Sequence, residues 1–297
     1  MAEQLIAIFC DIDDFCKEYE SYCTTHLLMD KDHFIPRTAM SLSEIMTIVV
    51  WFHLSHYRQF KWYYKNYVCE QMREYFPRLV SYNRFVEIMQ PAVVPLTLYL
   101  MGRRFGKCSG VSFVDSTPLE VCDPHRIYSH KVFSGLAARG KSSTGWFFGF
   151  KLHLAINDRG EILAFCLTPG NVDDRDWKVL DRLTKEMYGK LFADRGYLSA
   201  KLFEKLWQER GIQLITKLKK NMKNKLMAYT DKILLRKRAV IESVNDFLKN
   251  ECYIEHSRHR SVTNFLVNVV SALIAYSFLP SKPSLGSLPL LNEALVF

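Results

Sequence analysis

The stretch Phe147-Phe-Gly-Phe-Lys-Leu-His-Leu-Ala-Ile156 decides the fold class, because its apolar side chains alternate with a period of two. Such alternation is typical of a β-strand that buries one face. Asn157-Asp-Arg-Gly160 has the composition of a tight turn, and residues 161–167 form a second apolar segment. The two segments are therefore predicted to pair as a β-hairpin. The apolar face of the first strand carries Phe148, Phe150, Leu152, Leu154 and Ile156.

On each side of this hairpin, a short apolar segment runs directly into an aspartate. Val111-Ser-Phe-Val114 precedes Asp115, and Lys190-Leu-Phe-Ala193 precedes Asp194. A further apolar segment covers residues 212–217. Short apolar runs bounded by polar residues predict buried strands. We therefore expect a sheet of five strands, two of which have an aspartate at their carboxyl end.

Helices are predicted between and after these strands. Asp173 or Asp174 can cap one helix, and Ser199 can cap the next. A third helix, over residues 232–249, carries Glu242. Helices that alternate with strands after an initial hairpin predict an α/β fold, in which a mixed five-stranded sheet carries helices on both faces.

The chain before residue 105 is predicted to be helical throughout. Ser41-Leu-Ser-Glu44 is a capping box that opens an apolar run of helical length. In the segment Arg58-Gln-Phe-Lys-Trp-Tyr-Tyr-Lys65, aromatic residues at helical spacing are expected to face a core, and the basic residues between them are candidate phosphate contacts. Ser81 can cap a following helix. Two short helices around a turn suggest a helix-turn-helix, although any small helical bundle would look similar.

The composition favours a nucleic-acid partner. The chain of 297 residues contains 40 Lys and Arg against 31 Asp and Glu, which gives a net charge of +9. A basic balance of this size favours polyanions. Hydrophobic residues make up 48% of the chain, so it is not a disordered tail.

Cysteine spacing and hydropathy predict a cytoplasmic protein without a membrane anchor. None of the eight cysteines has the spacing of a zinc ribbon or a thioredoxin motif, so reduced and mostly buried thiols are expected. The first residues lack the basic region and apolar run of a signal peptide. The longest apolar run, Phe265–Leu279, is too short to span a bilayer and is expected to be a buried helix.

Asp115, Asp194 and Glu242 are candidate metal ligands. Adjacent central strands of an open α/β sheet end on the same side, so the two aspartates are expected to lie side by side. They would repel each other unless a cation lay between them, and a helix across the sheet could add Glu242. Such oxygen ligands suit Mg²⁺ or Mn²⁺. Each residue also has an ordinary explanation, because either aspartate could begin a turn and Glu242 could pair with Arg238 on a helix surface.

Five motifs, taken together and in order, resemble a known family. They are Val114-Asp-Ser-Thr-Pro118, Phe148-Gly-Phe-Lys-Leu-His153, Pro169-Gly-Asn-Val-Asp-Asp174, Ala193-Asp-Arg-Gly-Tyr197 and Arg238-Ala-Val-Ile-Glu242. Over about residues 35–280 the chain resembles bacterial insertion-sequence transposases with a DDE catalytic domain, and most nearly insertion-sequence family 982. The resemblance implies a helical DNA-binding region at residues 1–105, a ribonuclease-H-like catalytic domain at residues 106–280, and a C-terminal tail at residues 281–297.

The resemblance also implies a reaction and its partners. Asp115, Asp194 and Glu242 would be the catalytic residues and would hold two Mg²⁺ or Mn²⁺ ions. Activated water would cut the transposon ends, and the freed 3′-hydroxyl would attack target DNA. The partners would be double-stranded DNA, at the terminal inverted repeats and the target, and a second copy of the chain. The alternatives are a nuclease of the same fold that does not join strands, and a transposase-derived DNA-binding protein without catalysis.

The last catalytic helix of the related families carries a Tyr, Arg, Glu and Lys signature. Arg238, Glu242 and Lys249 match it, whereas Leu235 stands at the tyrosine position. The resemblance therefore implies DNA contacts for the arginine and the lysine, and no role for a phenol at that position.

Other residues of the motifs are candidate DNA contacts with open alternatives. Lys151 and His153 share a strand face that could either contact phosphate or face solvent. Asp174 could support the site or cap a helix. The basic residues after the fifth strand could bind phosphate or form a solvated surface. The full set of predicted DNA contacts is Lys151, His153, Arg195, Tyr197, Lys217, Lys219, Lys220, Arg238 and Lys249.

Overall fold

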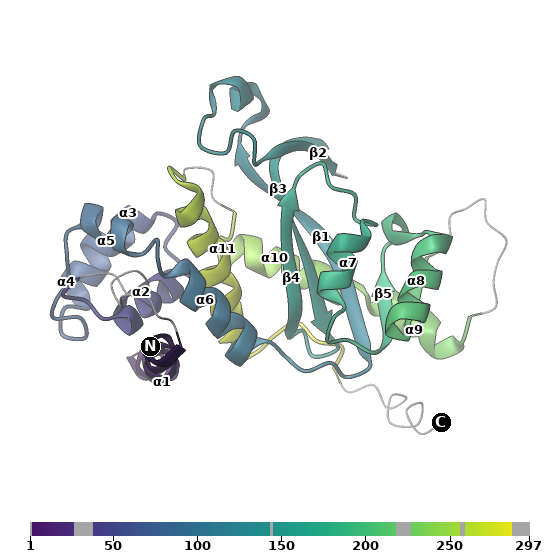
Figure 1. Ribbon diagram of the computed structural model, residues 1–297, viewed down its shortest axis with the longest axis horizontal. Coiled ribbons are helices and arrows are strands. Elements are labelled where there is room, and N and C mark those ends of the chain that lie inside the picture. Colours follow the sequence, from purple (N-terminus) through teal and green to yellow (C-terminus); the bar gives the residue numbers. More distant parts are fainter. Residues whose placement is uncertain (1, 27–37, 143–144, 218–226, 256–258, 287–297) are drawn as a thin grey trace. The chain divides into compact units, whose positions relative to one another are not determined.

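The computed structural model describes residues 2–26, 38–142, 145–217, 227–255 and 259–286 (Figure 1). Contacts between residues divide the chain into two compact units. The helical unit consists of Met1–Arg104 and Leu248–Leu279, and the sheet unit consists of Phe105–Phe247 and Pro280–Phe297. Leu248–Leu279 therefore pack with the N-terminal helices, although they follow the sheet in the sequence.

The described residues of the helical unit form helices joined by turns and short connections, as the sequence predicts. Two π-helical segments continue α-helices without a break: η2 continues α3, and η3 continues α6. The elements are α1 (Ala2–His26), α2 (Leu42–Leu54), α3 (Phe60–Trp62), η2 (Tyr63–Val68), α4 (Cys69–Gln71), α5 (Tyr82–Ile88), α6 (Val93–Tyr99), η3 (Leu100–Arg104) and α11 (Val262–Ser277).

The core of the helical unit is built around α2, whose residues are almost all buried. The predicted capping box is present, because the Glu44 N–H donates to Ser41 Oγ at 3.1 Å and the Ser41 N–H donates to the Glu44 carboxylate at 2.7 Å. The two helices α1 and α11 pack against α2. A helix that is apolar on all sides is stable only when neighbours cover every side, which places α2 at the centre.

The aromatic segment after α2 also faces this core, as predicted. Tyr63 and Tyr64 are fully buried. Their hydroxyls donate to the carbonyl oxygens of Ile48, at 3.0 Å, and Val80, at 2.7 Å. Each ring therefore buries a large apolar area without leaving its hydroxyl unpaired.

Two further features bear on the sequence predictions. All eight cysteines are free, and five of them are buried. No single helix among the described residues is long and apolar enough to cross a membrane. One pair, Tyr82–Ile88 and Val93–Arg104, meets that criterion by length and composition alone, with a bend of 61° between its two helices.

The sheet unit contains six strands and the helices that cover them. The strands are β1 (Val111–Cys122), β2 (Ala138–Ser142), β3 (Gly145–Asn157), β4 (Ile162–Pro169), β5 (Gly189–Ala193) and β6 (Ile212–Thr216). The helices are η4 (Pro124–Ser129), α7 (Trp177–Leu183), η5 (Arg195–Tyr197), α8 (Ala200–Arg210), α9 (Tyr229–Lys237) and α10 (Ala239–Asn250), the last of which continues into the helical unit.

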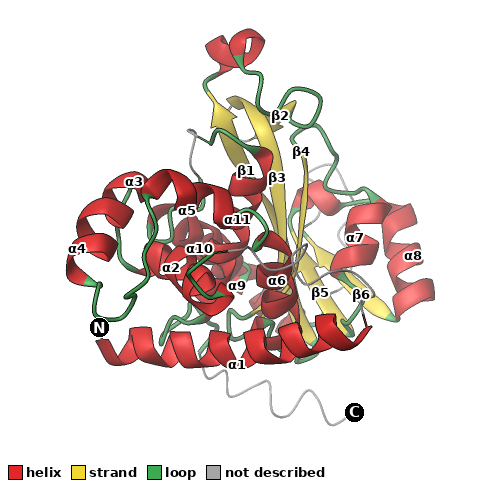
Figure 2. Ribbon diagram, turned by 60° about the vertical axis from the view of Figure 1, so that its left-hand side comes forward, coloured by secondary structure: helices red, strands yellow, loops and turns green. Residues whose placement is uncertain are grey.

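The sheet is mixed, in agreement with the predicted fold class. β3 pairs antiparallel with β1 and β4, whereas β5 pairs parallel with β1 and β6. The short strand β2, which the sequence did not predict, pairs with the beginning of β3 along the edge that β4 uses farther on. Five strands therefore lie side by side, with helices packed against both faces, as in a ribonuclease-H-like core. The strands β1 and β3 run on beyond the ends of β5 and β6 (Figure 2).

The first strand is longer than predicted, because it has different partners along its two edges. On one edge the pairing with β5 ends at Phe113, whereas on the other edge the pairing with β3 continues to Cys122. Pro118 lies in this extension, opposite Lys151 of β3. A proline is tolerated there, because the edge toward β5 has no strand to receive a hydrogen bond.

The helices of the sheet unit also depart from the sequence prediction in two places. Asp176, rather than Asp173 or Asp174, caps α7 and accepts a hydrogen bond from the Lys178 N–H at 2.8 Å. The helix predicted over residues 232–249 is broken at Arg238 into α9 and α10. By contrast, Ser199 caps the start of α8 as predicted, and the helix ends at Gly211, which has a left-handed backbone conformation.

The two faces of the sheet carry different side chains. Val114 and Ala155 face α7 and α8 in a buried cluster with Leu180 and Leu206. Because strand residues alternate, the neighbouring Asp115 points to the other face.

Candidate active site

Asp115 and Asp194 hold equivalent positions along two neighbouring parallel strands, Asp115 within β1 and Asp194 directly after β5. In the register between β1 and β5, Phe113 pairs with Phe192, and each aspartate follows two residues later. The two phenylalanine rings stack beneath them with centroids 5.5 Å apart. The sequence prediction that these carboxylates lie side by side at one edge of the sheet is thus consistent with this register, although β1 itself continues past Asp115.

Helix α10 adds two polar side chains to this place. Glu242 lies in its first turn, and Asn245 follows three residues later on a neighbouring helical face. The Asn245 side-chain amide donates to Asp115 Oδ2 at 3.3 Å. Asn245 is buried, and sequence reasoning missed it, although its spacing from Glu242 was a usable signal.

Arg238 lies among the three acidic side chains. Its guanidinium is hydrogen-bonded to Glu242 and lies 3.9 Å from Asp115 Oδ1 and 3.8 Å from Asp194 Oδ1. The break between α9 and α10 occurs at this residue, whose side chain is only 10% exposed. We call Asp115, Asp194, Glu242 and Arg238 the acid cluster.

The charges of the acid cluster are incompletely paired. One guanidinium faces three carboxylates, and its Nη1 atom makes no hydrogen bond to any described residue. The amide oxygen of Asn245 is also without a partner among the described residues. Burial raises the pKa of Asp115 to about 6, and although Arg238 opposes this rise, Glu242 and Asp194 add to it. An additional cation would therefore be attracted to this cluster.

The donor set fits a hard divalent cation, but not in the present arrangement. Among the described residues, no group of three or more His, Cys, Asp or Glu side chains is placed to hold one metal ion. The acid cluster has the carboxylate oxygens that Mg²⁺ and Mn²⁺ prefer, gathered around a positive charge. In this structure the charge facing the three carboxylates is the Arg238 guanidinium.

A second charged group lies on the opposite face of β1. The Asp174 carboxylate accepts hydrogen bonds from Ser116 Oγ at 2.9 Å and from Lys151 Nζ at 3.1 Å. Lys151 Nζ also donates to the Val172 carbonyl at 2.9 Å. We call Asp174, Ser116 and Lys151 the Asp174 cluster. Of the two alternatives for Asp174, the structure does not bear out the capping role, because Asp176 caps α7.

Lys151 and His153 do not join the acid cluster. They share a face of β3 with each other, and the register places His153 opposite Ser116 on the Asp174 side. His153 is fully buried, and its Nε2 atom is 2.9 Å from Thr168 Oγ1. In this conformation their partners are Val172, Asp174 and Thr168, and their contact with phosphate stays a prediction.

The other residues predicted to contact DNA differ in their exposure to solvent. Tyr197 is buried in the cluster under α7 and α8, so its side chain cannot reach DNA in this conformation. Arg195 and Lys217 are exposed, and they remain candidate contacts. Lys219 and Lys220 lie outside the described residues.

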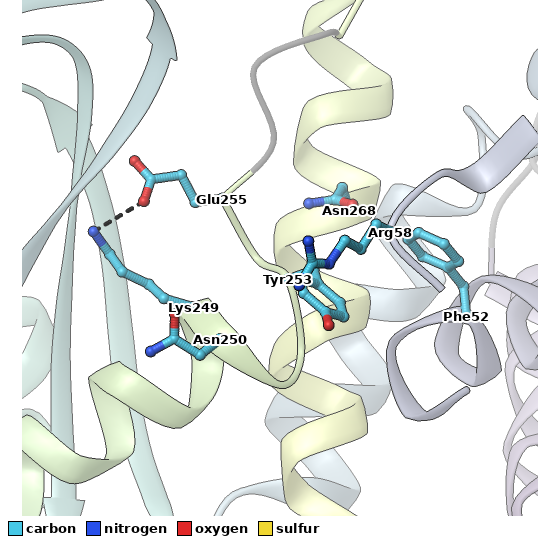
Figure 3. A pocket seen from close by; sticks show the side chains of 7 residues that line it. All are labelled: Phe52, Arg58, Lys249, Asn250, Tyr253, Glu255 and Asn268. Atoms are coloured by element: carbon cyan, nitrogen blue, oxygen red, sulfur yellow. Dashed lines mark ion pairs between the residues drawn. The ribbon is translucent and has the colours of Figure 1, made fainter. Parts of the chain in front are cut away.

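Lys249 belongs to the helical unit. It pairs with Glu255 at 3.0 Å, beside a pocket of about 440 Å³ whose wall includes Arg58 and Tyr253 (Figure 3). The sequence signature that relates Lys249 to Glu242 by helical spacing therefore joins residues from two compact units.

Comparison with known proteins identifies the class to which this fold and site belong. The family described as "Transposase DDE domain" matches residues 105–262, more than half of the chain. The chain belongs to this family. It is a catalytic family that acts on DNA and implies divalent metal ions. The match begins where the sheet unit begins, and it covers all three carboxylates of the acid cluster. No curated protein matches the chain.

Proposed function

We propose that the chain is the transposase of an insertion sequence of family 982, which cleaves DNA at the transposon ends and joins the freed 3′ ends to target DNA. The observation that carries this proposal is the gathering of Asp115, Asp194 and Glu242, from two strands and a helix, around the single cation Arg238. The five ordered sequence motifs support the finer family assignment.

Asp115, Asp194 and Glu242 are proposed to hold two Mg²⁺ or Mn²⁺ ions. When bound, these ions supply charge neutralisation at the scissile phosphate and activation of the attacking oxygen. Asn245 holds one oxygen of Asp115, so that the other oxygen keeps its direction. Arg238 partly balances the charge of the three acids in the free protein, and its guanidinium is proposed to turn to a DNA phosphate when the carboxylates have another cation.

The DNA contacts are proposed to come from both units. In the sheet unit, Arg195 and Lys217 are exposed, and Arg195 immediately follows Asp194. The helical region at residues 1–105 is proposed to recognise the terminal inverted repeats, and the catalytic domain at residues 106–280 to carry out the reaction, with residues 281–297 as a tail. Joining two ends to one target requires two active sites, so the working form is proposed to be a homodimer on DNA.

An excision assay tests the proposal. A donor plasmid that carries the gene with its native flanking DNA is incubated in Mg²⁺ with the wild-type protein or with Asp194→Asn, which keeps the side-chain shape and removes the charge. We expect excised and reinserted products from the wild type alone. Cleaved ends that are never joined would identify a nuclease, and cutting by Asp194→Asn at the wild-type rate would refute the assigned site.

A further inference from the structure

The helical unit contains an open cavity of about 570 Å³ that the proposed reaction does not use. Residues of α2, α5 and α11 line it, together with the segment that begins α3. Its volume lies within the range of pockets in proteins that bind small molecules or cofactors.

Two buried polar atoms in the wall of this cavity have no hydrogen-bond partner among the described residues. They are Asn264 Oδ1 and Ser271 Oγ, on residues that are 9% and 0% exposed. The two residues are seven positions apart on α11 and therefore lie on one face of that helix. Because buried polar groups in proteins nearly always have partners, this pair points to a ligand that supplies them.

Aromatic rings form another part of the wall. Phe60 and Tyr82 both line the cavity, with their ring centroids 6.5 Å apart. Flat apolar surfaces beside amide and hydroxyl groups suit a nucleobase, which stacks through its faces and forms hydrogen bonds through its edge. The Asn side-chain amide can both donate and accept along such an edge.

Basic groups complete the chemistry of a nucleotide site. Lys61 and Arg260 line the same cavity and are exposed. The N-terminus of α11, capped by Ser261, adds the positive end of a helix of 16 residues. Glu87 also lines the cavity, but its carboxylate is paired with Arg84 at 2.9 Å.

We propose that this cavity binds one unpaired nucleotide of DNA. The base lies against Phe60 and Tyr82, its edge forms hydrogen bonds with Asn264 and Ser271, and its phosphate contacts Lys61 and Arg260. The inference rests on the proposed function only in taking DNA as the source of the nucleotide. It adds to that function a preference for DNA with a single-stranded tail.

The test compares two fluorescent probes on the full-length protein. One probe is a blunt DNA duplex, and the other is the same duplex with a short single-stranded tail. Ser271→Ala and Asn264→Leu are each expected to weaken binding of the tailed probe by about tenfold, which is typical of losing hydrogen bonds to a base, and to leave blunt-duplex binding unchanged.

The stability of the free variants separates binding from structure. Both substitutions remove a buried polar atom without a partner, so the melting temperature of the free protein is expected to stay the same or to rise. If Ser271 and Asn264 instead stabilised the fold, both substitutions would lower the melting temperature of the free protein. Arg260→Ala should also weaken tailed binding, whereas the matched variant Arg78→Ala, at an exposed arginine of the same unit that does not line the cavity, should not.

Each outcome decides between the proposals. Equal losses on both probes, a lower melting temperature with unchanged tailed binding, or binding of dAMP without any preference for tailed DNA would overturn the cavity proposal. Cleavage of transposon ends is measured in parallel in Mg²⁺. Cleavage without a tail preference would leave the proposed function intact and remove only the cavity proposal, whereas a tail preference without cleavage in the wild type would do the reverse.

Discussion

The acid cluster and the Asp174 cluster lie on opposite faces of β1 and differ in how completely their charges are paired. In the Asp174 cluster one carboxylate has one ammonium and one hydroxyl within hydrogen-bond distance. In the acid cluster a single guanidinium serves three carboxylates, two of them at 3.8 Å and 3.9 Å. Both clusters consist of ordinary charged residues, so composition does not distinguish them.

This difference in charge pairing indicates a different role for each cluster. In the Asp174 cluster the one carboxylate has an ammonium within 3.1 Å, so its charge is matched one to one and the pair can hold the strands together. In the acid cluster the carboxylates outnumber their cation, and burial raises the pKa of Asp115 to about 6. Binding of an added cation would therefore lower the repulsion among these carboxylates, as at many functional sites. We therefore expect substitutions in the acid cluster to change catalysis, and substitutions in the Asp174 cluster to change stability.

The largest effect is expected for Glu242→Gln. Loss of one carboxylate proposed to bind metal should lower the rate of end cleavage by about a thousandfold or more, because charge stabilisation of the transition state is lost. Cleavage of labelled transposon ends in Mg²⁺ measures it. Glu204→Gln, at an exposed glutamate of α8, is the matched control and should cleave at the wild-type rate. Equal rates for all three proteins would remove the distinction between the clusters.

The next effect is expected for Asn245→Ala. Loss of the amide that holds Asp115 should raise the Mg²⁺ concentration needed for half-maximal cleavage by about 10-fold to 100-fold, as for other residues that orient metal ligands. The maximal rate at saturating Mg²⁺ should change less. A Mg²⁺ titration identical to that of the wild type would show that Asn245 only fills space.

A smaller effect, on stability, is expected for Lys151→Met. This variant leaves the Asp174 carboxylate without its ammonium partner and should lower the free energy of unfolding by about 1–2 kcal/mol. Denaturant unfolding measures the change. The Mg²⁺ requirement for cleavage should be unaltered, and a shift in that requirement would mean that the two faces of β1 are coupled.

The smallest effect concerns pH. Burial lowers the pKa of His153 to about 4, although the nearby Asp174 opposes the shift, while Lys151 adds to it. Because the unfolded chain binds a proton at a pKa near 6.5, the stability from neutral His153 is present above that pH and is lost as the pH falls toward 4. We expect a loss of about 1 kcal/mol between about pH 7 and pH 5.5. His153→Gln should flatten this dependence, and an unchanged slope would place its origin elsewhere.

Local patterns predicted much of the secondary structure. The alternation in β3 and the short apolar runs before Asp115 and Asp194 identified strands that the structure contains. Caps at Ser41 and Ser199 identified the starts of two helices. These signals succeed because alternation and capping depend on residues only a few positions apart.

Two of the failures have a common cause in pairing between distant segments. The true length of β1 depends on the partner along each edge, and the cap of α7 depends on Asp174 being engaged by Ser116 and Lys151. Neither is visible in a local pattern. The break at Arg238 was missed for a different reason, because its neighbours in sequence have helical character on both sides.

The sequence by itself determined the class of the protein, through five of its strands and the two aspartates that come after apolar segments in two of them. Only the tertiary structure decided which charged residues meet. Period-two alternation showed that Lys151 and His153 share a face, but the register between β1 and β3 sets that face opposite Asp115. Likewise, the fold of the main chain at the break brings Arg238 among the three acids. The physical reason is that local periodicity defines the sides of one element, whereas long-range pairing defines what each side faces.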